Sequence, residues 1–263
     1  MKPIDAYRDT IDRAKTFLLY YDGLANIRER RIRKDWKSSF LKFMHWPATN
    51  SIERIDGKDA IIILKNKASL TPNHFSSAFL EDMLRAALAF GMSALDRYIH
   101  ERVIKGIIKA LKSGSLTKQQ EEFSIPVKTA IQISEEALRA HKTGKNIRTA
   151  NIVRKKVQEL LHKRPFQNWR EIEYAFNLLG VTNLSGELQT AYRIPNIKLK
   201  KDKLNQIANR RNSIVHEGDL EKHERGGAAK MLPITKKYVK DSLEFLDELV
   251  SNLEKVVEVA PKK

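Results

Sequence analysis

The chain has 263 residues, of which 41% are hydrophobic and 31% are charged, proportions typical of a folded globular protein. Its 49 lysines and arginines face 32 acidic residues, and the net charge of +17 favours a polyanionic partner, with nucleic acid first. The alternative is that many lysines only solvate long helices. The absence of cysteine excludes disulfides, thiolate zinc sites and cysteine nucleophiles. No segment resembles a signal peptide or a membrane span, so we expect a cytoplasmic protein.

The first part of the chain is predicted to be helical and then to form a β-hairpin. Apolar residues such as Ile11 and Leu18 recur at helical spacing over residues 4–44. Within that stretch, the basic run RERRIRKDWK is expected to be a solvated helix face or part of a phosphate-binding surface. Two isoleucine-rich segments flank Asp56-Gly57, a dipeptide that favours a tight turn, so residues 51–64 predict a small hairpin.

A long helix is predicted next, running from Thr71-Pro72 to about Lys112, because threonine caps helices and proline suits the first helical position. Gly91 lies in the middle of its apolar face and would allow another helix to approach closely. Two final helices are predicted over residues 200–217 and 235–257. These elements predict an all-α antiparallel bundle with long helices.

Residues 113–199 predict shorter helices over 126–140, 147–163 and 167–179. Nine lysines and arginines and one acidic residue lie between positions 139 and 164, and the aromatic-rich stretch KRPFQNWREIEYAF follows. Basic residues beside aromatic rings suit single-stranded nucleic acid, whereas aromatic residues buried in a core are the competing explanation. The candidates for phosphate contact in this stretch are Arg154, Lys155 and Lys156.

The helix predicted over residues 200–217 carries an arginine in the middle of its apolar face. At about 100° per residue, Arg211 lies at the centre of the apolar residues, while Arg210 lies about 100° away on the polar flank. Because a guanidinium keeps its charge, its burial requires either an internal acid or an anion that docks in a cleft or interface. Asn212 and His216 share one edge of this face, and Arg211 and His216 are about 7.5 Å apart along the axis. The three side chains could therefore converge on one phosphate.

These residues carry a resemblance to a known family. Arg211-Asn212-Ser-Ile-Val-His216 matches the R-N-x-x-x-H form of the R-x4–6-H motif, and the chain resembles the HEPN superfamily of helical ribonucleases. Both the context LNQIANRRNSIVHEGD and the earlier AALAFGMSALDRYIHERVIKG are similar to the RiboL-PSP-HEPN branch. The resemblance implies one HEPN-like domain over residues 1–263. Its core would cover about 70–112 and 200–258, with a helix and hairpin at 1–66 and a helical insertion at about 113–199.

The resemblance also implies a metal-independent endoribonuclease that needs no cofactor and acts as a homodimer with a composite active site. Single-stranded RNA would be cleaved by its own 2′-OH, leaving 2′,3′-cyclic phosphate and 5′-OH ends. His216 would act as general base or acid, Arg211 would stabilise the phosphoryl charge, and Asn212 would orient the histidine or the phosphate. A toxin or antiviral-defence role, with an antitoxin or defence-system partner protein, is implied as well.

Supporting roles follow for residues outside the motif. Asp96 is the best candidate to hold Arg211 or His216, and Arg102 and Arg210 are candidates for RNA contact, with a structural ion pair as the alternative for Asp96 and Arg102. No histidine spacing such as H-E-x-x-H predicts a metal site. Two other functions stay open: a non-catalytic RNA- or nucleotide-binding HEPN protein, and a helical interaction subunit of a defence or toxin–antitoxin complex.

Overall fold

The computed structural model describes residues 2–65, 69–114, 116–123, 126–142, 149–221 and 230–259. In this part of the chain, helices dominate and a small antiparallel sheet is the second component, which confirms the predicted fold class. In chain order the elements are α1 (Pro3–Gly23), β1 (Arg28–Arg30), α2 (Lys34–Phe43), β2 (Ile52–Asp56), β3 (Ile61–Lys65), the 3-10 turn η1 (Pro72–Phe75), α3 (Ser77–Ser113), α4 (Lys118–Glu121), α5 (Val127–Lys142), α6 (Thr149–Leu161), α7 (Trp169–Leu178), α8 (Leu184–Tyr192), α9 (Lys198–His216) and α10 (Lys236–Val259).

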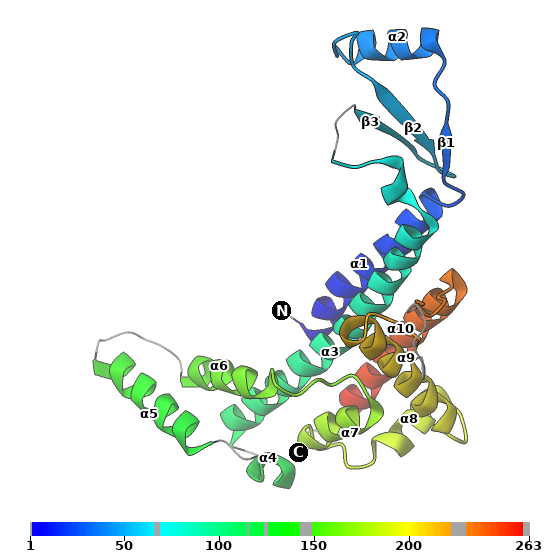
Figure 1. Ribbon diagram of the computed structural model, residues 1–263. Coiled ribbons are helices and arrows are strands. Elements are labelled where there is room, and N and C mark those ends of the chain that lie inside the picture. Colours follow the sequence, from blue (N-terminus) through cyan, green and yellow to red (C-terminus); the bar gives the residue numbers. More distant parts are fainter. Residues whose placement is uncertain are drawn as a thin grey trace.

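Helix α3 is the axis around which the bundle is built (Figure 1). Its 37 residues extend for about 55 Å at a rise of 1.5 Å per residue. Helices α1, α6, α7, α9 and α10 all pack against it, so Leu88, Leu95 and Ile99 are completely buried. A Cβ atom at Gly91 would lie 2.4 Å from Leu243 Cδ2 of α10. The prediction that Gly91 allows a close helix approach is therefore confirmed.

The N-terminal region differs from the single helical stretch predicted over residues 4–44. Helix α1 ends at Gly23, and Asn26 adopts a left-handed conformation with φ 58°. Strand β1 then pairs with β2, which places Arg28 opposite Asp56. This strand escaped prediction because three polar residues have no apolar alternation, and main-chain hydrogen bonds to a distant segment define it. The hairpin of β2 and β3 is confirmed, one residue away from the predicted limits.

Residues 28–65, which we call the arm, stand away from the bundle at one end of α1 and α3 (Figure 1). The arm has a small apolar centre of its own, formed by Leu41, Ile52, Ile55 and Leu64. Its β2–β3 turn is attached to the end of α1, because the Asp59 N–H donates a hydrogen bond of 2.9 Å to the Gly23 carbonyl. A Cβ at Gly57 would lie 2.8 Å from the same carbonyl oxygen, so glycine is needed for this contact.

The helices predicted at 126–140, 147–163 and 167–179 correspond to α5, α6 and α7, and α4 and α8 were not foreseen. Phe166, Trp169 and Phe176 are buried in the main core with residues of α3, α9 and α10. Core packing, the competing explanation for this aromatic-rich stretch, is therefore the correct one for these three rings. No helix among the described residues is both long and apolar enough to span a bilayer.

Candidate functional site

Helix α9 packs its apolar stripe against α3, and Arg211 lies in that stripe. Leu204, Ile207 and Ala208 are buried, and Arg211 and Ile214 are half-buried, which confirms the position deduced from helical periodicity. The stripe becomes uncovered toward the end of the helix, where Val215 is 47% exposed and His216 is exposed as well. The centre of the stripe is thus protein-covered, and its C-terminal end is open.

Arg211 is only partly provided with hydrogen-bond partners. Its Nη1 atom donates a hydrogen bond of 3.1 Å to Oδ1 of Asn212, the next residue of the predicted site. Its Nε atom is buried and has no hydrogen-bond partner among the described residues. Leaving a buried donor unpaired costs about 1–3 kcal/mol, and more for a charged group. An arginine in this condition is suited to accept an external anion.

Asp96 of α3 lies near Arg211, as expected for its supporting role. The Asp96 carboxylate is close enough for the guanidinium to lower its pKa, but burial is the larger influence and raises the pKa overall. The carboxylate is shared among several groups: its Oδ1 accepts a hydrogen bond of 2.5 Å from the Phe166 N–H, and His100 Nε2 lies 3.6 Å from the same oxygen. Asp96 is therefore not committed to Arg211 alone.

His100 is a fifth polar residue of the site, and no role was predicted for it. It follows Asp96 by one turn of α3, and its ring centroid lies 4.7 Å from that of Phe166. Burial lowers the pKa of His100, while the Asp96 carboxylate opposes this shift. The signal in the sequence was the i,i+4 spacing of Asp96 and His100 within ALDRYIHE, because side chains four residues apart share a helix face.

The family model described as RiboL-PSP-HEPN matches residues 52–259, which is most of the chain. The chain belongs to the RiboL-PSP-HEPN family. No curated protein and no solved structure matches it. Membership indicates an RNA-related function, since HEPN domains are commonly ribonucleases.

The family match extends further than the resemblance quoted from the two motif segments. It includes residues 113–199, the segment expected to be an insertion, together with strands β2 and β3. Strand β1 and helix α2 lie outside the matched range. Within the part of the chain that the structure describes, no three histidine or acidic side chains form a group that could hold a metal ion.

Arg210, the residue before Arg211 on α9, is hydrogen-bonded to other parts of the protein. Its Nη2 donates hydrogen bonds to Asp219 Oδ2 at 2.7 Å and to the carbonyls of Leu232 and Pro233 at 3.1 Å. Arg85 of α3 donates from Nε to the same Asp219 oxygen at 2.8 Å. We call Arg85, Arg210 and Asp219 the anchor. Because Arg210 is paired inside the protein, we withdraw it as an RNA contact.

The anchor forms because the chain reverses directly after α9. Gly218 and Asp219 both have positive φ angles, 66° and 58°, and the Asp219 N–H donates to the Ser213 carbonyl at 2.9 Å. This turn brings the 1% exposed Asp219 side chain between α9 and α3. Although burial disfavours the Arg85 charge, the hydrogen bond that Arg85 donates to the Asp219 carboxylate raises the pKa of Arg85 overall. The polar flank predicted for Arg210 is therefore covered by the segment after the helix.

Most of the other predicted RNA contacts are also paired internally. Arg102 of α3 pairs with Glu254 of α10 and lies 5.7 Å over the Tyr98 ring. Arg154 pairs with Glu101 at 2.9 Å, and the mostly buried Lys156 pairs with Glu159 at 3.2 Å. Lys155 is exposed. The structural alternative thus describes Arg102, whose ion pair joins α3 to α10. Lys156 also lies 3.8 Å from Glu136 of α5, so its charge is shared between α5 and α6.

Proposed function

We propose that the chain is an endoribonuclease of the HEPN type that cleaves single-stranded RNA. The observation that carries this proposal is the buried, unpaired Nε of Arg211, beside Asn212 and on a stripe that ends openly at His216. A phosphate would supply acceptors for the terminal guanidinium nitrogens, of which only Nη1 has a hydrogen bond to a described residue, and charge-assisted hydrogen bonds to arginine are among the stronger ones. The net charge of +17 attracts the same ligand.

The reaction uses a nucleophile that RNA itself contains. The 2′-OH attacks the adjacent phosphorus, the bond from phosphorus to the 5′ oxygen breaks, and a 2′,3′-cyclic phosphate and a 5′-OH are formed. A histidine titrates near neutral pH, so His216 is suited to accept the 2′-OH proton or to protonate the leaving oxygen. Arg211 stabilises the charge that develops on the phosphoryl oxygens, and Asn212 orients the guanidinium through its hydrogen bond.

Asp96 and His100 act as positioning residues for Arg211 in this proposal. Asp96 lies near the guanidinium but is also bound by the Phe166 N–H and by His100. Because Asp96 is shared in this way, it restrains Arg211 but neutralises only part of the guanidinium charge. An incoming phosphate therefore competes with a weakened internal partner, which favours binding of the anion.

We further propose that the active enzyme is a homodimer whose two motif helices face each other. The uncovered end of the stripe, at Ile214 and the 47% exposed Val215, adjoins His216 and gives a second copy an apolar contact. Two copies of His216 would then lie at one composite site, where one can act as base and the other as acid. The setting we infer is a cytoplasmic toxin or antiviral-defence role with a partner protein that restrains cleavage, which the family resemblance supports.

The direct test is cleavage of single-stranded RNA in EDTA by the wild type, Arg211→Ala and His216→Ala, with end-group analysis of the products. Arg170→Ala is the matched control, because Arg170 is an exposed arginine of α7. We expect cyclic phosphate ends from the wild type and the control, and a loss of about a hundredfold or more in each site variant. Cleavage that survives both site substitutions contradicts the proposal.

The same experiment separates the two alternative functions. A non-catalytic RNA-binding protein would show salt-sensitive binding that Arg211→Ala weakens, without cleavage under any condition. A helical interaction subunit would show little affinity for RNA at either low or high salt. Gel-shift measurements at two salt concentrations therefore accompany the cleavage assay.

A further inference from the structure

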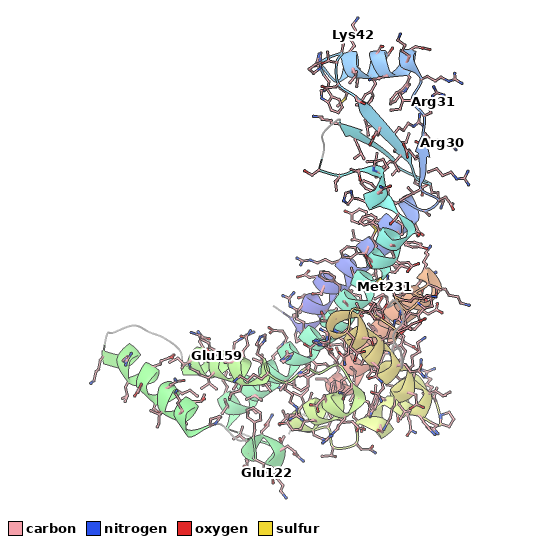
Figure 2. All side chains as sticks on the ribbon, in the orientation of Figure 1. Arg30, Arg31, Lys42, Glu122, Glu159 and Met231 are labelled. Atoms are coloured by element: carbon pink, nitrogen blue, oxygen red, sulfur yellow. The ribbon has the colours of Figure 1, made fainter. Side chains whose placement is uncertain are left out.

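The arm carries a concentration of positive charge outside the part of the chain that the family model matches. Residues 28–43, which form β1 and α2, contain seven lysines and arginines and two acidic residues. Figure 2 shows Arg30 and Arg31 at the side of the arm where β1 lies, and Lys42 on α2 at its tip. Arg30 lies 3.8 Å from Asp56. The side chains of the remaining six cations make no ion pair or hydrogen bond with the described residues: Arg28, Arg31, Arg33, Lys34, Lys37 and Lys42.

Aromatic rings accompany these cations on α2. Trp36 stacks on Phe40 with 4.9 Å between the ring centroids and 12° between the planes, and Trp46 meets the edge of Phe40 at 5.8 Å. Phe43 is 79% exposed, although phenylalanine is usually buried. It follows the buried Leu41 by two positions, about 200° around the helix, so it points away from the small core of the arm.

We propose that the arm binds a single-stranded segment of RNA that flanks the cleaved bond. This inference rests on the proposed function, because the same RNA strand would be held at the arm and cut at Arg211 and His216. Unpaired cations attract phosphates, and exposed flat rings stack on bases without regard to sequence. The arm offers both kinds of group on one short helix and the adjoining strand.

The distance between arm and site sets the kind of RNA that can use both. Asp96 follows the first residue of α3 by 19 positions, so it lies about 29 Å along the helix from the end that adjoins the arm. The arm is held in place by the hydrogen bond from Asp59 to Gly23 at the end of α1. An RNA bound at both places must extend along α1 and α3, and a trinucleotide that fills the site cannot reach the arm.

The test compares two variants that each lose three positive charges. The arm variant carries Arg31→Gln, Lys34→Gln and Lys42→Gln. The control variant carries Lys109→Gln, Lys112→Gln and Lys128→Gln, three exposed lysines of α3 and α5 that lie in the direction away from the arm. Binding to a long single-stranded RNA made uncleavable by 2′-O-methylation is measured at several salt concentrations, and cleavage of a long RNA is compared with that of a trinucleotide.

We expect the arm variant to bind the long RNA more weakly than the control, with a salt-dependence slope reduced by about 2, since each phosphate contact to a single strand contributes about 0.7. Its ratio of long-RNA to trinucleotide cleavage also falls. Phe43→Ser, which leaves the core untouched, weakens long-RNA binding about fivefold or more if a base stacks on this ring.

The inference is overturned if the arm variant and the control bind the long RNA with the same affinity. The arm would then bind another partner, such as an acidic protein. This result is distinct from failure of the proposed function, because the binding measurement uses an uncleavable RNA. A wild type that binds this RNA through the arm but cleaves none would refute the nuclease proposal alone. Thermal melting of each variant establishes that the comparison is made between folded proteins.

Discussion

Neighbouring arginines on α9 have opposite environments. In the anchor, Arg210 and Arg85 share Asp219 Oδ2 at 2.7 and 2.8 Å, and both guanidinium groups also donate to the Leu232 carbonyl. At the site, Arg211 has one hydrogen bond, to the neutral Asn212, and its buried Nε has no partner among the described residues. The difference teaches that an arginine held by an internal carboxylate supports the fold, whereas Arg211, which forms no ion pair with the described residues, is available to a ligand.

The largest expected effect comes from removing the charge at the centre of the anchor. Asp219→Asn removes the carboxylate that pairs with Arg210 and the shortest ion pair of Arg85, which keeps Asp82 at 3.2 Å and Glu81 at 3.3 Å, while both arginines stay largely buried. Breaking a buried ion pair from one side costs about 3–5 kcal/mol of unfolding free energy. Chemical denaturation measures this loss, with Asp202→Asn on the exposed face of α9 as the control. Equal stability of the two variants would remove the structural role assigned to the anchor.

The next prediction concerns the open end of the stripe beside the site. Val215→Glu places a charge in the surface proposed to meet a second copy, so we expect dimerisation to weaken at least tenfold and cleavage to fall with it. Leu199→Glu is the matched control, because Leu199 is an 81% exposed aliphatic residue of the same helix. Sedimentation measures both variants. A dimer that survives Val215→Glu but not Leu199→Glu would move the interface to the other end of α9.

A smaller effect on stability is expected at Asp96. Burial raises the pKa of this carboxyl group, which shows that its charge is poorly compensated. Asp96→Asn keeps an oxygen acceptor for the Phe166 N–H, so we expect it to cost no more than about 1 kcal/mol of unfolding free energy, the scale of one hydrogen bond. Cleavage should fall because Arg211 loses a restraint. A loss of unfolding free energy as large as that of Asp219→Asn would make Asp96 a second anchor.

The smallest expected effect is a pH dependence that originates at His100. Burial lowers its folded-state pKa below the usual value of about 6.5, so the unfolded chain binds the proton more readily. Stability therefore decreases as the pH falls through this value and is regained above it. Asp96 has the opposite effect on stability. Its raised pKa means that the folded state binds the proton more readily, so its contribution to stability increases as the pH falls. His162 and Glu101 also face His100, and Arg211 faces Asp96.

The contribution of His100 is isolated by measuring the difference in unfolding free energy between the wild type and His100→Gln at pH values above and below about 6.5. We expect the wild type to lose more stability than the variant as the solution becomes acidic. Parallel curves would show that His100 is not the titrating group.

Periodicity predicted the parts of the molecule that depend on neighbours in sequence. The long helix, its glycine at the contact with α10 and the position of Arg211 in the stripe all follow from about 100° per residue. The start of that helix was predicted wrongly, because Pro72–Phe75 form a separate 3-10 turn and α3 begins at Ser77. The hairpin followed from the isoleucine-rich segments on either side of Asp56-Gly57, although the tight turn expected at this dipeptide is replaced by a loop over residues 57–60, with Asp56 paired to Ile61. Strand β1 did not, because its pairing with β2 joins residues that are far apart in the chain.

The hydrogen-bond partners of Arg210 and Arg211 depend on contacts that no local sequence pattern predicts. Asp219 reaches Arg210 only because two consecutive residues adopt positive φ angles after α9, and it reaches Arg85 across a separation of 134 residues. The environment of His100 likewise depends on Phe166, which follows α6. The sequence therefore located Arg211 correctly, whereas the polar flank and RNA contact predicted for Arg210 are replaced by internal hydrogen bonds.

The central claim is tested most directly by comparing Arg210→Ala with Arg211→Ala in two measurements, unfolding free energy and cleavage of single-stranded RNA in EDTA. We predict that Arg210→Ala loses several kcal/mol of stability, on the order of a broken buried ion pair. Arg211→Ala should fold as stably as the wild type and lose cleavage. An Arg211→Ala protein that is as unstable as Arg210→Ala, or that cleaves RNA like the wild type, would contradict the assignment of Arg211 to the phosphate.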